Sequence, residues 1–112
     1  MMEHPFLYEA KGDTLVIHMP KEVDHHNCRR LMLDTELLLS ENYIRRILFD
    51  LSRTEFMDSS GLAVMTRRYK QMKESHGTTG YYGAGRQIMR ILKTAGIAAL
   101  MTDYGSEEEK RS

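Results

Sequence analysis

Residues 56–62, with the sequence Phe-Met-Asp-Ser-Ser-Gly-Leu, mark the point where an extended segment gives way to a helix. A β-branched and aromatic run over residues 44–50 precedes them and reads as a buried strand, and a helical pattern of apolar residues starts at Leu62. Aspartate and serine favour helix starts because their side-chain oxygens accept hydrogen bonds from unpaired backbone N–H groups. The stretch therefore predicts a strand followed by a capped helix.

The chain after this stretch predicts more units of the same kind. Apolar residues at helical spacing predict a helix over residues 62–77 and a third helix over residues 88–95, closed by Gly96. Residues 78–83 between these helices are expected to form a strand. The short apolar run over residues 97–102 is expected to form the last strand.

The chain before this stretch predicts a hairpin and one more helix. Residues 6–10 and 14–19 flank the turn signal Lys11-Gly12-Asp13, so we expect them to pair as two strands. A helix follows, with Asp24 or Asn27 as its cap. Its apolar stripe consists of Cys28, Leu31, Met32, Thr35, Leu38 and Leu39.

The resulting order of elements is β-β-α-β-α-β-α-β. A helix between successive strands implies parallel pairing with right-handed crossovers, and the opening hairpin adds one antiparallel pair. We therefore predict a single α/β domain over residues 1–104, with a mixed, mostly parallel sheet and helices packed on it. Residues 105–112 are expected to form a polar C-terminal tail.

The composition is that of one globular domain. The chain has 112 residues, of which 41% are hydrophobic and 29% charged, and its formal net charge is zero. A balanced charge argues against nucleic acid or an anionic membrane as the main partner, since either usually needs a basic face. Basic pairs at residues 29–30, 45–46 and 67–68 are interpreted as solvated faces, because acids elsewhere balance them.

The expected location is the cytoplasm. Cys28 is the only cysteine in the sequence, so an intrachain disulfide is excluded. No apolar run approaches the ~20 residues that span a bilayer. The N-terminus lacks the basic start and long apolar stretch of a signal peptide.

Metal and dinucleotide sites have weak support, and no cofactor is expected. Asp24-His25-His26 offers two histidines, but adjacent side chains point in different directions and rarely bind one ion. Gly83 and Gly85 have the Gly-x-Gly spacing of a dinucleotide site, but Ile88 stands where the third glycine is required. A tight turn into the third helix is the better interpretation.

Catalysis also lacks the residues that it needs. Asp50 at a strand end resembles a phosphate-accepting aspartate, but such a site needs further acids to hold magnesium. Ser59 as a nucleophile would need Gly-x-Ser-x-Gly, and residue 57 is Met57. No enzyme activity is expected, although a small enzyme or nucleotide-binding domain built around Asp50, Asp58 and Ser59 remains the alternative. Spacing alone leaves Ser59 either as part of a helix cap or as a site of phosphorylation.

Two segments resemble a known family. Residues 56–64 and 68–73 resemble the signature of the anti-sigma factor antagonists, which are bacterial STAS-domain proteins. Residues 22–26, Glu-Val-Asp-His-His, are similar to the Glu-Leu-Asp-His-His loop of the sporulation branch. The predicted order of elements also matches that family. An antagonist for a general stress sigma factor is the second choice within it.

The resemblance implies a mechanism and a set of site residues. The unphosphorylated antagonist would bind an anti-sigma factor that is also a serine kinase, and thereby release the sigma factor. That kinase would phosphorylate the first serine of the pair, Ser59, and a PP2C-type phosphatase would reverse the reaction. Asp24, Asp58 and Ser60 would line the same partner-binding surface as Ser59. Metal and catalytic residues are not implied.

Three positions depart from the family's pattern. Ala63 replaces a usual glycine, which should be harmless because a methyl group suits a helix. Lys21 stands where glycine is common before the Glu22 loop, which changes the expected fit of that loop to a partner. The family's C-terminal helix would start near Tyr104, but only residues 105–112 follow it. That helix is expected to be short or absent.

Overall fold

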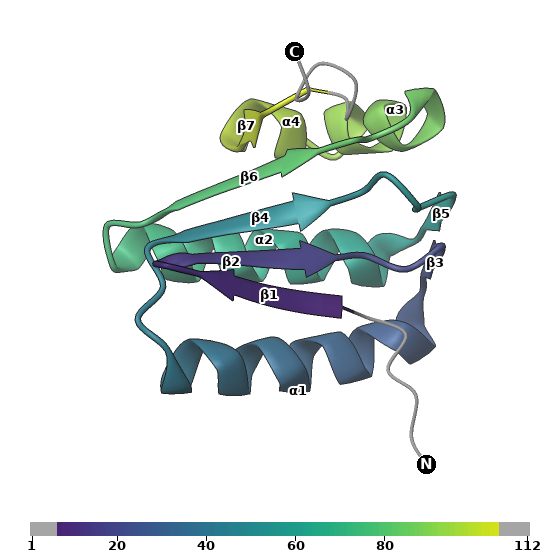
Figure 1. Cartoon of the computed structure of the whole chain (residues 1–112). Coiled ribbons are helices and arrows are strands. Elements are labelled where there is room, and N and C mark those ends of the chain that lie inside the picture. Colours follow the sequence, from purple (N-terminus) through teal and green to yellow (C-terminus); the bar gives the residue numbers. More distant parts are fainter. Residues whose placement is uncertain (1–6, 106–112) are drawn as a thin grey trace.

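A five-stranded sheet with helices packed against it organises residues 7–105, the part of the chain that this computed structural model describes (Figure 1). The first two strands are antiparallel, and every other neighbouring pair in this sheet is parallel. This confirms the predicted mixed, mostly parallel α/β architecture. In spatial order the strands are β1 (Leu7–Lys11), β2 (Thr14–His18), β4 (Arg46–Asp50), β6 (Thr78–Tyr82) and β7 (Thr102–Asp103).

The three predicted helices are present. Figure 1 shows α2 running behind the strands, and α1 packs beside it. Both helices turn the apolar stripes that their spacing predicts toward the core, and Asn42 is the C-cap of α1. The helix bounds are α1 (His25–Glu41), α2 (Ser59–Glu74), α3 (Arg86–Thr94) and a short α4 (Ile97–Leu100).

The core lies between the helices and one face of the sheet. Successive strand residues point to opposite faces, so residues paired across parallel strands share a face. Leu15 pairs in register with Ile47, and Ile17 pairs with Phe49, which in turn pairs with Tyr81. All five side chains are buried.

The prediction for residues 97–102 is wrong. Ile97 to Leu100 form helix α4, and only Thr102 with Asp103 form the edge strand β7, parallel to β6. A short apolar run cannot be assigned to a helix or a strand from periodicity alone. Residues 97–100 are helical because Gly96, with a positive φ of 84°, turns the chain directly from α3 into a new helical turn.

The prediction that residues 67–68 form a solvated basic face is wrong for Arg68. The Arg68 side chain on α2 is fully buried, and its guanidinium Nη2 donates to Glu36 Oε1 on α1 at 3.0 Å. The other terminal nitrogen, Nη1, donates to Gln71. Arg68 therefore joins the two long helices midway along their length, a role that an Arg-Arg pair in the sequence does not reveal.

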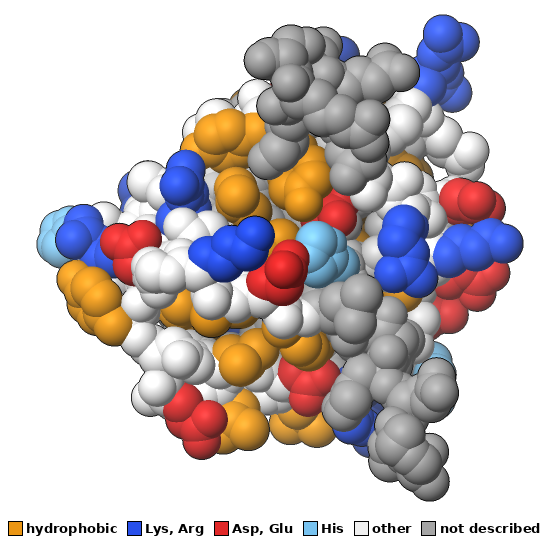
Figure 2. Space-filling model, in the orientation of Figure 1, with side chains coloured by type: hydrophobic (Ala, Val, Ile, Leu, Met, Phe, Trp, Pro, Cys, Tyr) orange, Lys and Arg blue, Asp and Glu red, His pale blue; other side chains and the backbone are white. Residues whose placement is uncertain are grey.

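Residues 106–112, most of the predicted tail and any C-terminal helix, lie outside the described residues. Within residues 7–105, no helix is both long enough and apolar enough to cross a membrane. Figure 2 shows one face of the molecule, on which acidic, basic and histidine side chains are interspersed among apolar ones. That distribution agrees with the formal net charge of zero.

Candidate functional site

Two very short strands bring the starts of α1 and α2 together. β3 (Glu22–Val23) and β5 (Phe56–Met57) pair in parallel, with Val23 opposite Met57. Each strand leads directly through one aspartate into a helix, so Asp24 and Asp58 occupy equivalent places. Figure 1 shows β3 and β5 side by side at one end of the molecule. The sequence analysis did not predict this pair.

Both aspartates cap helices. Asp24 is the N-cap of α1, and its Oδ1 accepts a hydrogen bond from the backbone N–H of Asn27 at 2.9 Å. Asp58 is the N-cap of α2, and its Oδ1 accepts from the backbone N–H of Ser60 at 2.8 Å and of Gly61 at 3.4 Å. This confirms the predicted helix start at the serine pair.

Asp58 also holds the neighbouring helix. Its second oxygen, Oδ2, accepts from the backbone N–H of His25, the first residue of α1, at 3.2 Å. The Asp58 N–H in turn donates to the carbonyl of Val23 at 3.2 Å. The first N–H groups of a helix have no partner within the helix. The Asp58 carboxylate accepts hydrogen bonds from such groups at the starts of both α1 and α2. The two starts form one connected unit.

The two serines lie differently on this unit. Ser59 is the first residue of α2 and is exposed, and its hydroxyl has no hydrogen-bond partner among residues 7–105. Ser60 is half-buried, and its hydroxyl oxygen lies 3.4 Å from Nδ1 of His25. The structure therefore brings the predicted residues Asp24, Asp58, Ser59 and Ser60 together at one end of the fold. It also adds His25, which the sequence analysis considered only as a metal ligand.

Gly61 sets how closely this unit packs. A Cβ atom built on Gly61 would lie 2.7 Å from side-chain carbons of both Met57 and Val23, and 3.2 Å from the Val23 carbonyl oxygen. Real Cβ atoms do not approach other atoms so closely, so a larger residue displaces either these side chains or the first turn of α2. The glycine in the serine motif is therefore required by packing.

The variant Gly61→Ala is expected to lower the free energy of unfolding by about 1–3 kcal/mol, because an added methyl overpacks a buried contact. Chemical denaturation followed by circular dichroism measures this change. Gly85→Ala is the matched control, since a Cβ there meets nothing within 4 Å, and its cost should stay below about 1 kcal/mol. Equal effects of the two substitutions would contradict the packing role of Gly61.

Asp50 belongs to a separate network. Its Oδ2 lies 2.5 Å from Nδ1 of His18, and Nε2 of His18 lies 2.7 Å from Oε1 of Glu9. Its Oδ1 accepts hydrogen bonds from both the hydroxyl and the backbone N–H of Ser52. Among residues 7–105, no hydrogen bond joins Asp50 to Asp58 or Ser59. The three residues of the alternative enzyme site are thus divided between two networks.

The charges of this network depend on pH. Burial by itself would lower the pKa of His18, but its hydrogen bonds to Glu9 and Asp50 outweigh burial and raise that pKa above its usual value. Burial by itself would raise the pKa of Asp50, but hydrogen bonds from Ser52 and His18 outweigh it and lower that pKa. The hydrogen bond from His18 also lowers the pKa of Glu9. When it is protonated, His18 on β2 links a carboxylate of β1 to a carboxylate of β4, the strands on its two sides.

The raised pKa of His18 and the lowered pKa values of Asp50 and Glu9 make the stability of the protein depend on pH. The stabilisation from His18 is fully present below about pH 6.5, its unfolded pKa, and is lost as the pH rises through its raised folded pKa. The carboxylates contribute above about pH 4 and lose their contribution as the pH falls through their lowered folded pKa values. The free energy of unfolding should therefore decrease between pH 6 and pH 9 in the wild type and stay nearly constant in His18→Gln. Parallel curves for the two proteins in urea titrations would contradict this link.

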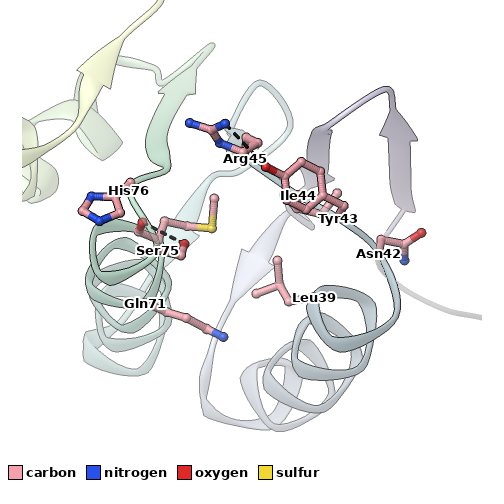
Figure 3. Close-up of a pocket in the computed structure, with 9 residues that line it drawn as sticks. Leu39, Asn42, Tyr43, Ile44, Arg45, Gln71, Ser75 and His76 are labelled. Atoms are coloured by element: carbon pink, nitrogen blue, oxygen red, sulfur yellow. Dashed lines mark hydrogen bonds between the residues drawn. The ribbon is translucent and has the colours of Figure 1, made fainter.

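A cavity lies at the far ends of the same two helices. Its volume is about 460 Å³, and it opens between the last turns of α1 and α2. Figure 3 shows Leu39 and Gln71 pointing into the space between these helices, with Tyr43, Arg45 and His76 around the opening. None of the predicted site residues lines it. The site at the serines is therefore an exposed surface and is separate from this cavity.

Metal binding has no support from the arrangement of ligands. Among the described residues, no group of three or more histidine, cysteine, aspartate or glutamate side chains is placed to hold a metal ion. His25 and His26 are both exposed, and the polar contacts of His25 go to Asp58 and Ser60. The network of Glu9, His18 and Asp50 is held together by its own hydrogen bonds.

The fold and the site define a small α/β domain that presents a serine on a surface made by two helix starts. The chain belongs to the STAS domain family, whose model matches residues 6–110. The sequence resemblance to this family is thereby confirmed for nearly the whole chain.

Known proteins resemble this chain in sequence or in fold. An anti-sigma F factor antagonist from Paenibacillus polymyxa is 27% identical over 99 residues, which cover 88% of this chain and 85% of that protein. The structure of the anti-sigma factor antagonist SpoIIAA in its unphosphorylated form matches with a TM-score of 0.81 and 24% identity, covering 95% of this chain and 92% of that one. The structure of SpoIIAA from Bacillus in the phosphorylated form matches with a TM-score of 0.74 and 24% identity. The match covers 95% of this chain and 96% of that one. At these identities the two structures establish the shared fold.

Proposed function

We propose that this protein is an anti-sigma factor antagonist, which binds an anti-sigma factor in its unphosphorylated form and so releases a sigma factor. The observation that carries the proposal is the exposed Ser59, which starts α2 beside the capped start of α1. The names of similar proteins, an anti-sigma F factor antagonist and SpoIIAA, support the same function. The protein acts in the cytoplasm by binding, without catalysis of its own.

Phosphorylation of Ser59 is the proposed switch. A phosphate adds about −1.5 to −2 charges at neutral pH. At Ser59 it would lie beside Asp58, in a surface that must lose water when a partner closes over it. The dipole of α2 favours a negative charge at its N-terminal end, so the domain stays folded while its affinity for the partner falls. Switching is thus local and electrostatic.

The partners that we propose are those that the resemblance to the anti-sigma factor antagonists implies. The anti-sigma factor is itself the serine kinase that uses ATP to modify Ser59, and a PP2C-type phosphatase removes the phosphate. Asp24, Asp58 and Ser60 contact the anti-sigma factor together with Ser59. The sigma factor released is one of sporulation, the branch suggested by the loop at residues 22–26, with a general stress sigma factor as the second choice. Nucleic acid and membranes are not among the partners that we propose.

Phosphate mapping tests the proposal. The protein is mixed with ATP and the anti-sigma factor kinase of the same organism, and the product is analysed by mass spectrometry. One phosphate on Ser59 is the expected result, and the variant Ser59→Ala should remain unmodified. A phosphate on Ser60 alone, or on neither serine with a kinase that is active on its other substrates, would overturn the assignment.

The alternative function, a small enzyme or nucleotide-binding domain, has a different signature. It needs Asp50, Asp58 and Ser59 to act together, whereas Asp50 is bonded to His18 and Ser52. Turnover of a phosphate ester by the isolated protein, lost in both Asp50→Asn and Ser59→Ala, would favour the alternative. The antagonist proposal expects no such turnover.

A further inference from the structure

A groove runs between α1 and α2 directly behind the serine site. It has a volume of about 320 Å³ and is separate from the cavity in Figure 3. At its head lie His25 and Ser60, the two residues whose side chains meet at 3.4 Å. Its walls continue along both helices with Cys28, Arg29 and Met32 from α1, and Ala63, Val64 and Arg67 from α2.

The floor of this groove is apolar and uncharged. Val64 and Cys28 are both buried at its base. Burial, together with the negative charges of Asp58 and Asp24, raises the pKa of the Cys28 thiol to about 11, so the thiol is protonated at neutral pH. Further along the helices, Arg68 binds Glu36 across the helix pair. The groove is therefore open near the serines and bounded where the helices are joined.

The rim of the groove is basic. Arg29 and Arg67 are both exposed, and neither forms an ion pair with another residue in the range 7–105. Their sequence neighbours differ, since Arg30 pairs with Asp34 at 3.4 Å and Arg68 pairs with Glu36. In the pairs at residues 29–30 and 67–68, one arginine is thus used within the fold and the other borders the groove. The described lining contains no acidic residue.

We propose that this groove binds an acidic, amphipathic segment of the anti-sigma factor. One apolar side chain of that segment packs on Val64 and Cys28, and carboxylates on either side of it bind Arg29 and Arg67. The proposal rests on the proposed function, because the groove shares His25 and Ser60 with the phosphorylation site. Apolar contact supplies affinity, and the paired charges set the orientation of the partner and speed its association.

The groove extends the contact surface beyond the serines. The half-buried Asp24 and the exposed Ser59 have small polar side chains, and such surfaces alone contribute little apolar burial. A groove lined by Met32, Ala63 and Val64 supplies the apolar part that a specific interface needs. Because it adjoins Ser60, a partner seated in the groove necessarily comes close to the phosphate on Ser59.

Charge reversal tests the proposal. The full chain is titrated with the purified anti-sigma factor in the presence of ADP, which does not support phosphorylation, and the dissociation constant is measured by calorimetry. Arg29→Glu and Arg67→Glu are each expected to weaken binding about tenfold, and the double variant about a hundredfold. Raising the salt concentration should weaken the wild-type complex more than that of Arg29→Gln/Arg67→Gln, which removes the charges without reversing them.

Matched controls separate this site from general charge effects. Arg90→Glu makes the same change at an exposed position of α3 and should leave the dissociation constant within threefold of the wild-type value. Ala63→Trp, which fills the groove from an exposed position, should weaken binding at least tenfold. Circular dichroism and thermal unfolding confirm that each variant is folded, and the Gln variants provide the measurement if a Glu variant is not.

The possible outcomes are distinct. If the wild type does not bind the anti-sigma factor, both the proposed function and the groove proposal fail. If the wild type binds and Ser59→Asp does not, while both arginine variants bind like the wild type, only the groove proposal fails. If the arginine variants instead change the sedimentation of the protein alone, the groove binds a second copy of this chain, and the proposal is overturned.

Discussion

The variant Ser59→Asp should bind the anti-sigma factor more than a hundredfold more weakly than the wild type. Ser59 is exposed at the first residue of α2, so a carboxylate there faces any partner that closes over the helix starts. It adds a second negative charge beside Asp58, and that charge must lose its hydration without gaining a partner. A loss of ~3 kcal/mol corresponds to more than a hundredfold in the dissociation constant. Isothermal titration with the unphosphorylated anti-sigma factor measures it.

Ser59→Ala is the matched control for this prediction. Its side chain is small and uncharged, so binding should stay within a few-fold of the wild type while phosphorylation is abolished. Equal affinities of the Asp and Ala variants would show that charge at this position does not control binding. In that case a switch based on phosphate would need a change of conformation in addition to a local charge.

The variant Asp58→Ala should lower the free energy of unfolding by about 2–3 kcal/mol. Losing an N-cap costs ~1–2 kcal/mol, and the lost hydrogen bond to the exposed His25 at the start of α1 adds ~1 kcal/mol. Asp58 accepts from Ser60 and Gly61 in its own helix and from His25 in the other. For a chain of this size the midpoint of thermal unfolding should fall by roughly 10 °C.

Asp24→Ala is the comparison that isolates the contribution of the contact between Asp58 and the start of α1. Asp24 caps only its own helix, so its removal should cost about 1 kcal/mol. Asp58→Asn keeps an acceptor oxygen and should fall between the wild type and Asp58→Ala. If Asp24→Ala and Asp58→Ala were equally destabilising, the contact between Asp58 and His25 would contribute nothing to stability.

Much of the fold could be predicted because its signals are local. Asp24 and Asp58 could be predicted as helix caps, because each has a side-chain oxygen and is followed by apolar residues at helical spacing. The stripes of α1 and α2 span several turns each, which makes their period clear. The site residues could be grouped because the family signature includes both segments. Whether Ser59 accepts phosphate stays a prediction, since a sequence pattern and a static structure do not record the modification.

The parts that could not be predicted depend on contacts between distant segments. β3 and β5 have two residues each, too few for a periodic pattern, and they are strands only because they pair with one another. The burial of Arg68 depends on Glu36 from another helix. The groove needs the facing sides of α1 and α2 to be aligned, which no single helix reveals. In α4 the apolar run is too short to show either period.

The parallel pairing of β3 with β5 also determines what an enzyme acting on Ser59 has to recognise. The surface around this serine combines residues from two stretches far apart in the sequence, with His25 held against Asp58 by the fold. A synthetic peptide covering only residues 52–66 would carry the serine but would lack Asp24, His25 and one wall of the groove. Under the proposed function, a kinase that contacts both stretches would recognise a conformational determinant, so unfolded or newly synthesised chains would escape modification.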